Sequence, residues 1–153
     1  MRLLLASIMA LSLLAACGHD HDHDGDHLLC QGDEETLTPG LAKLGDDGFF
    51  KVHILSTDPS PLAVDDNTFV VRVTDPNDTA LDGITFGVVE TWQRVHDHGT
   101  PVVPEVTPLA ETGEFQIDKM NVIHTGSWLF RFGPTDGTNT DSVEFNFGIQ
   151  CPN

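Results

Sequence analysis

The sequence predicts an all-β protein: one antiparallel, immunoglobulin-like β-sandwich of about seven strands. Apolar residues alternate with polar ones in several short runs, which is the pattern of strands that bury one face. Turn-forming stretches separate the runs, for example Asp58-Pro59-Ser60-Pro61 and Asp75-Pro76-Asn77-Asp78. After residue 16 no stretch keeps the 3.6-residue period of an amphipathic helix. Short strands at this spacing are typical of antiparallel sandwiches.

Each expected strand is identified by its apolar residues at every second position. In chain order these are Phe50, Val52 and Ile54; Phe69, Val71 and Val73; Ile84, Phe86 and Val88; Phe115 and Ile117; Trp128, Phe130 and Phe132; and Val143, Phe145, Phe147 and Ile149. The third run is the longest and continues through Trp92 towards His96. We assign residues 30–153 to this single domain, which is long enough to bury a core of its own.

The N-terminus has the features of a secretory signal. Met1-Arg2 is positively charged, and the apolar run from Leu3 to Leu14 is too short to span a bilayer as a helix. The following Leu14-Ala15-Ala16-Cys17-Gly18 resembles the lipobox of bacterial lipoproteins. That resemblance implies cleavage after residue 16, a lipid on Cys17 and, in a Gram-negative host, sorting to the outer membrane. The protein would then be lipid-anchored in the bacterial cell envelope, facing the periplasm or the surface. The alternative is an ordinary signal peptide with a chance cysteine.

A histidine- and aspartate-rich segment follows, and residues 17–29 are expected to form a disordered tether. Gly18 to His27 reads GHDHDHDGDH and contains no apolar residue that could be buried. Its imidazoles and carboxylates can reach one ion, so it is a candidate secondary metal site of loose geometry. The alternative is a hydrophilic spacer. The candidate ligands are His19, His21, His23 and His27.

Composition limits the possible partners. The formal net charge is −17, which argues against nucleic acid, because phosphate binding relies on clustered Lys and Arg. If Cys17 carries a lipid, Cys30 and Cys151 remain as a pair in an oxidising compartment, and we expect them to form a disulfide that joins the ends of the domain. The alternative for this pair is metal ligation by two thiolates.

The strongest functional signal is a group of candidate metal ligands. His96 and His98 are two residues apart and would project from the same side of an extended strand, with Gly99 allowing a turn or a close approach just after them. A second segment with Met120 and His124 lies about twenty residues further along the chain, which is enough for one loop and one strand to bring it back. These two residues complete the predicted site. Imidazole is the commonest ligand of zinc and copper, and a thioether favours Cu(I). The alternative places Met120 in the core and gives His124 a hydrogen bond within a turn.

These residues also carry a resemblance to a known family. Trp92, His96-Asp97-His98-Gly99-Thr100, Pro104, Gly113-Glu114-Phe115 and Gly126-Ser127-Trp128-Leu129 occur in the order seen in the YtkA-like family of small extracytoplasmic domains. The resemblance covers roughly residues 48–149 and implies an immunoglobulin-like fold and a link to copper and cytochrome oxidase assembly. That family often has methionine and proline where this chain has His124 and Thr125. A histidine there favours Cu(II) or Zn²⁺ over Cu(I).

The sequence does not predict an enzyme. It has no Gly-x-Ser-x-Gly elbow, no His-Glu-x-x-His and no phosphate-binding glycine loop. A blue-copper site is also disfavoured, because it requires a free cysteine thiolate. We therefore expect a lipid-anchored protein that binds copper, or alternatively zinc, and acts in metal sequestration or in handover to a protein partner. The competing hypothesis is an envelope interaction module without a folded metal site.

Overall fold

The computed structural model describes residues 29–151. The predicted signal peptide, the predicted lipidation site Cys17 and the predicted tether ligands His19, His21, His23 and His27 lie outside these residues. The described chain forms nine strands and no α-helix. Within it, no helix is long and apolar enough to cross a membrane. The strands are β1 (Leu41–Leu44), β2 (Lys51–Asp58), β3 (Asp65–Thr74), β4 (Thr85–Gln93), β5 (His98–Gly99), β6 (Glu105–Pro108), β7 (Glu114–Val122), β8 (Gly126–Thr135) and β9 (Val143–Ile149).

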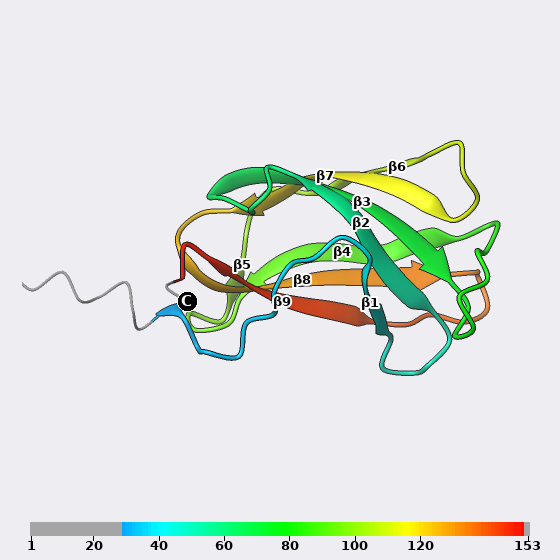
Figure 1. Ribbon diagram of the computed structural model, residues 1–153, viewed down its shortest axis with the longest axis horizontal. Coiled ribbons are helices and arrows are strands. Elements are labelled where there is room, and N and C mark those ends of the chain that lie inside the picture. Colours follow the sequence, from blue (N-terminus) through cyan, green and yellow to red (C-terminus); the bar gives the residue numbers. More distant parts are fainter. Residues whose placement is uncertain (1–28, 152–153) are drawn as a thin grey trace, which may run out of the picture.

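The strands form two antiparallel sheets, which confirms the predicted β-sandwich. One sheet has the order β1-β2-β3-β7-β6 and the other the order β5-β4-β8-β9, and Figure 1 shows them packed face to face. The six runs identified by alternation are β2, β3, β4, β7, β8 and β9. The additional strands β1, β5 and β6 lie at sheet edges and have only two to four residues. Such strands are too short to show a period, so the sequence does not reveal them.

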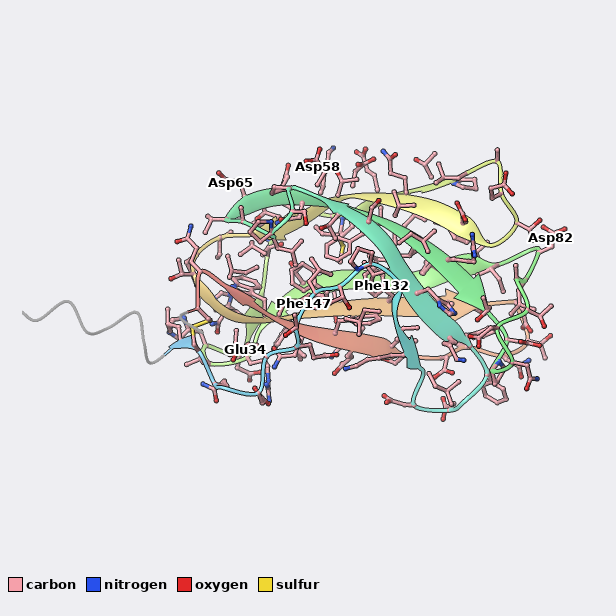
Figure 2. All side chains as sticks on the ribbon, viewed as in Figure 1. Glu34, Asp58, Asp65, Asp82, Phe132 and Phe147 are labelled. Carbon is pink, nitrogen blue, oxygen red and sulfur yellow. A yellow bond between two sulfur atoms is a disulfide. The ribbon has the colours of Figure 1, made fainter. Side chains whose placement is uncertain are left out.

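The core lies between the sheets and is rich in phenylalanine. Phe69 of β3 packs against Phe130 and Phe132 of β8, with ring centroids 5.1 and 5.8 Å apart. All three side chains are fully buried, and burial of each contributes roughly 1.5–3 kcal/mol to folding. Figure 2 shows Phe132 and Phe147 between the layers and Asp58, Asp65 and Asp82 on the outside. The alternation in the sequence therefore separates the core face from the solvent face.

In β4 the alternation changes face part-way along the strand. The sequence pattern predicts Val88 on the buried face with Ile84 and Phe86, but the Val88 side chain is 48% exposed. The pairing with β8 shifts between Phe86 and Val88, and a β-bulge of this kind reverses which residues face inward. The prediction for Val88 is therefore wrong. Beyond the bulge, Thr91 and Gln93 face inward and are buried.

The predicted disulfide is confirmed. Cys30 and Cys151 are bonded across a sequence separation of 121 residues, so they are not free thiolate ligands. Figure 1 places the first and last described residues and β5 at the same end of the sandwich. This end also carries the candidate functional site.

Candidate metal centre

Three histidines from two separate segments meet at this end of the sandwich. His96, His98 and His124 each present a ring nitrogen, and the three nitrogens lie within 4.8 Å of one another. The ring centroids are 5.8 Å apart for His96 and His98, 5.4 Å for His96 and His124, and 5.7 Å for His98 and His124. The structure thus brings together three of the four residues predicted as the site.

A tight hairpin positions the first two imidazoles. β4 and β5 pair through Gln93 with His98 and Trp92 with Gly99, and residues 94–97 form the turn. His96 therefore lies in the turn, and only His98 lies in a strand. The prediction of one extended segment is wrong on this point, and the two rings meet because the chain reverses. Gly99 does allow a close approach, since a Cβ there would lie 3.3 Å from the Thr91 carbonyl oxygen.

His98 lies at the edge of a row of side chains on the inner face of its sheet. Residues paired directly across strands project from the same face. The row runs from His98 to Gln93, then to Trp128 and Phe147. Its last three members are buried, whereas His98 is half-buried. The imidazole of His98 therefore sits where the apolar interior meets solvent, with its ring centroid 6.2 Å from that of Trp128.

His124 reaches the same place along the connection between the two sheets. β7 ends at Val122 and β8 begins at Gly126, so residues 123–125 cross the end of the sandwich. The indole N–H of Trp128 donates a hydrogen bond of 3.0 Å to the His124 carbonyl oxygen. The Trp128 ring also lies against the His124 imidazole, with centroids 5.2 Å apart. Trp128, which the sequence marks as a strand residue and as part of the family-like motif, thus holds this connection in place.

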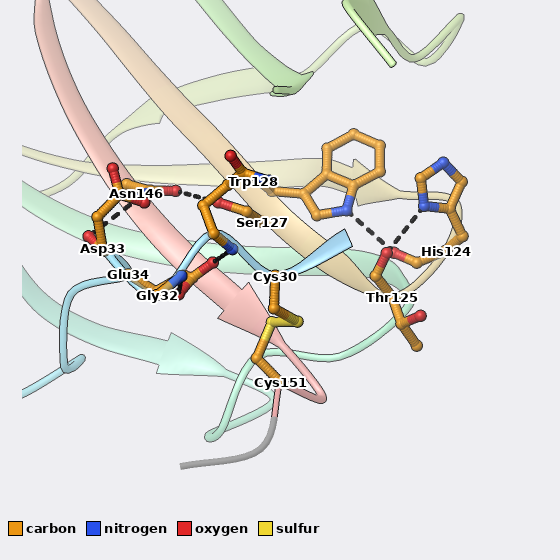
Figure 3. Close-up of a disulfide and its surroundings, with 11 residues drawn as sticks. Cys30, Gly32, Asp33, Glu34, His124, Thr125, Ser127, Trp128, Asn146 and Cys151 are labelled. Atoms are coloured by element: carbon orange, nitrogen blue, oxygen red, sulfur yellow. Dashed lines mark hydrogen bonds between the residues drawn. A yellow bond between two sulfur atoms is a disulfide. The ribbon is translucent and has the colours of Figure 1, made fainter. Parts of the chain in front are cut away.

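Hydrogen bonds fix the orientation of two of the imidazoles. The Nδ1 of His98 lies 3.0 Å from the Gly99 carbonyl oxygen. The Nδ1 of His124 lies 2.9 Å from the Thr125 carbonyl oxygen (Figure 3). A carbonyl oxygen only accepts hydrogen bonds, so each Nδ1 carries the proton and donates it. In the neutral ring this leaves the lone pair on Nε2. Metal-ligating histidines are held by an outer hydrogen bond of this kind.

The geometry fits a metal ion after a small adjustment. Imidazole nitrogens that bind a tetrahedral ion at 2.0–2.1 Å lie about 3.4 Å from one another. The separations of up to 4.8 Å are larger than this. Rotation of the exposed His96 side chain and slight movement of the other two rings would close the difference. Three protein nitrogens also leave a fourth tetrahedral position for another ligand.

Met120, the fourth predicted ligand, belongs to the hydrophobic core. Its side chain is fully buried within the core cluster, and its carbonyl oxygen accepts a hydrogen bond from the Asn67 side chain. The alternative interpretation of the sequence, in which Met120 is a core residue, describes this position. Its coordination of the metal stays a prediction.

Gln93 supports the site and was missed by sequence reasoning. Its Oε1 accepts a 2.7 Å hydrogen bond from the backbone N–H of His96, which holds the turn in place. The side chain is fully buried, and its Nε2 has no hydrogen-bond partner among the described residues. A buried polar residue just before the His-x-His pair would have indicated a supporting role. The sequence does not show that Gln93 faces inward, because this depends on the bulge in β4.

A second group of potential ligands lies at the same end. Cys30, Glu34 and Cys151 also place ligand atoms within 4.8 Å of one another. The two sulfurs are bonded to each other, and the Glu34 carboxylate accepts hydrogen bonds from the backbone N–H groups of Gln31 and Gly32 (Figure 3). With the disulfide formed, this group therefore has a structural role: it joins the N-terminal part of the domain to the end of β9.

Comparison with known proteins adds no assignment. No family model, no curated protein and no solved structure matches the chain. The resemblance to the YtkA-like family therefore stays a prediction. The functional conclusion depends on the geometry of the three histidines.

Proposed function

We propose that this protein binds one divalent transition-metal ion through His96, His98 and His124. The observation that supports this most directly is the convergence of three ring nitrogens within 4.8 Å. In two of the rings, Nδ1 is hydrogen-bonded to a backbone carbonyl and Nε2 is left to ligate.

The ligand set favours Cu²⁺, with Zn²⁺ as the alternative. Imidazole nitrogens suit both ions, and binding by a given nitrogen site is generally tighter for Cu²⁺ in the Irving–Williams order. Cu(I) prefers soft sulfur ligands. Here both described cysteines are in the disulfide and Met120 is in the core. The resemblance to the YtkA-like family points to copper as well.

We propose a role in metal sequestration or handover rather than in catalysis. The His96 side chain is exposed and the other two rings are half-buried, so the ion would be accessible to a metal-binding partner. Anchoring through Cys17 would place this exchange at the bacterial envelope membrane. The tether would collect ions close to the folded site by raising their local concentration.

Titration of the purified protein with Cu²⁺ and Zn²⁺ tests this proposal. The parent for this experiment carries asparagine at His19, His21, His23 and His27, so that only the folded domain offers imidazoles. We expect one equivalent of Cu²⁺ to bind. His98→Ala should weaken that binding by about 100-fold. Removal of a residue that only orients a metal ligand already lowers affinity by about 10- to 100-fold, so removal of a ligand itself should reach at least the upper value.

His53→Ala is the matched control for this titration. His53 is the one histidine of the described chain outside the group, and its imidazole lies 3.1 Å from the Thr74 hydroxyl on the other flank of the domain. We expect it to leave the Cu²⁺ affinity unchanged. A parent protein without a one-to-one site, or equal affinities for the His98→Ala and His53→Ala variants, would overturn the proposal and leave the sandwich as an interaction module.

A further inference from the structure

A second convergence of ligand atoms lies at the disulfide. The sulfurs of Cys30 and Cys151 and a carboxylate oxygen of Glu34 lie within 4.8 Å of one another, and all three residues are half-buried (Figure 3). Cys30 and Glu34 belong to the segment before β1, whereas Cys151 follows β9. While the bridge is intact, the two sulfurs are bonded to each other. Reduction of the bridge would leave two thiols beside a carboxylate.

Backbone contacts hold the Glu34 carboxylate beside the bridge. One of its oxygens accepts a 2.6 Å hydrogen bond from the N–H of Gln31, and the other accepts a 2.9 Å bond from the N–H of Gly32. An ionised carboxylate has about four lone-pair sites, so lone pairs remain for an ion. Gly148 permits the close approach, because a Cβ there would lie 3.0 Å from the Cys151 sulfur and 3.2 Å from Cγ of Glu34.

The bridge is accessible from a cavity of about 490 Å³, whose lining includes Glu34, Cys151, Leu62 and Phe147. This space admits a small dithiol, or an ion with a bound water. The Cα atoms of the two cysteines are 5.8 Å apart. Thiolates that bind a tetrahedral Zn²⁺ at about 2.3 Å lie about 3.8 Å from each other. Rotation of the two cysteine side chains provides that separation.

We propose that a dithiol reductant converts the Cys30–Cys151 bridge into a Zn²⁺ site formed by Cys30, Cys151 and Glu34. The dithiol gives up two electrons and two protons and becomes a disulfide, while the two cysteines become thiols. Zn²⁺ then displaces the two thiol protons into solvent and binds both thiolates and the carboxylate, with water in the fourth position. Thiolates suit Zn²⁺, and three negative charges favour a divalent cation. The ion would join the two ends of the domain in place of the covalent bond.

Titration with Cd²⁺, a soft analogue of Zn²⁺ whose bonds to thiolates absorb in the ultraviolet, tests the site. The protein is the full chain with Cys17→Ser, which leaves only the two cysteines of the bridge. After reduction by dithiothreitol and anaerobic removal of the reductant, we expect a thiolate absorption that rises with the first equivalent of Cd²⁺. The oxidised protein should show none. Imidazole ligation gives no such band, so the result is independent of the three-histidine site.

Glu34→Gln and Glu111→Gln are the matched variants. Both remove one carboxylate charge, and Glu111 is exposed in the turn between β6 and β7. We expect reduced Glu34→Gln to bind Cd²⁺ at least about tenfold more weakly than the reduced parent, since loss of a residue that only orients a ligand already costs about that much. Glu111→Gln should match the parent. Equal affinities of the two variants, or no thiolate band in the reduced parent, would overturn the inference.

Thermal unfolding followed by circular dichroism shows whether the site belongs to the folded domain. Reduction removes the stabilisation by the bridge, and an ion that binds only the folded chain restores stability. Zn²⁺ should therefore raise the melting temperature of the reduced parent by more than that of reduced Glu34→Gln. The histidines are the same in both proteins, so their contribution to the shift cancels. Equal shifts, or a reduced parent that stays unfolded with Zn²⁺, would overturn the inference.

Discussion

Replacing Cys30 and Cys151 together by serine is expected to lower the free energy of unfolding by about 4 kcal/mol. The bridge joins residues 121 positions apart, and closing so long a loop removes much of the conformational entropy of the unfolded chain. Urea denaturation at pH 7 measures the change. If the disulfide acts on the unfolded state, the dependence of the free energy of unfolding on urea concentration should also become steeper, because the unlinked chain exposes more surface on unfolding.

The double variant is preferred to a single substitution, which would leave a free thiol able to form intermolecular bridges. Reduction of the unaltered protein by dithiothreitol is the control and should reproduce the loss. A change of less than about 1 kcal/mol would contradict the prediction and would mean that the packing of the sandwich alone sets stability.

Asp141→Ala is the second substitution with a large expected effect, at the opposite end of the β-strands from the candidate metal centre. The Asp141 side chain is only 4% exposed. Its carboxylate accepts hydrogen bonds of 2.9 to 3.1 Å from four backbone N–H groups, those of Asp47, Phe49, Phe50 and Ser142. Alanine leaves these donors without their acceptor, and we expect a loss of about 3 kcal/mol in urea denaturation.

The contribution of Asp141 should depend on pH. Burial opposes the charge of this carboxylate, but the four N–H donors outweigh burial and hold the pKa of Asp141 below its ordinary value of 3.8. A carboxyl group whose pKa is lowered by folding stabilises the protein fully above the unfolded pKa. That stabilisation is lost as the pH falls through the lower folded pKa. The deficit of Asp141→Asn relative to the parent should therefore be constant near pH 7 and shrink below pH 3.8.

Asp46→Ala is the matched control for Asp141. Asp46 lies in the turn that Asp141 holds, but it is exposed, and surface substitutions of this kind usually change stability little. We expect Asp46→Ala to leave the unfolding transition in place and Asp141→Ala to leave the Cu²⁺ affinity unchanged. An equal loss from both variants would show that the turn, and not the carboxylate, carries the stability.

Features that depend on near neighbours in the chain can be predicted from the amino-acid sequence. The alternation of Phe69, Val71 and Val73, and that of Phe145, Phe147 and Ile149, predicts strands of a sandwich because side chains of a strand point to opposite faces in turn. Pairing of Cys30 with Cys151 followed from their number and from the expected compartment. The His96-Asp97-His98 spacing marked the candidate metal-binding segment but not its true conformation.

Features that depend on pairings between distant residues become visible only in the folded protein. The bulge in β4 arises from its register with β8, and it turns Val88 outward and Gln93 inward. His124 joins the other two histidines because residues 123–125 cross from one sheet to the other, while Met120 stays in the core. Leu29 meets Gly126, which is far from it in the sequence. A local period carries no information about such contacts, because sheet register and loop crossings are set by packing between segments far apart in the sequence.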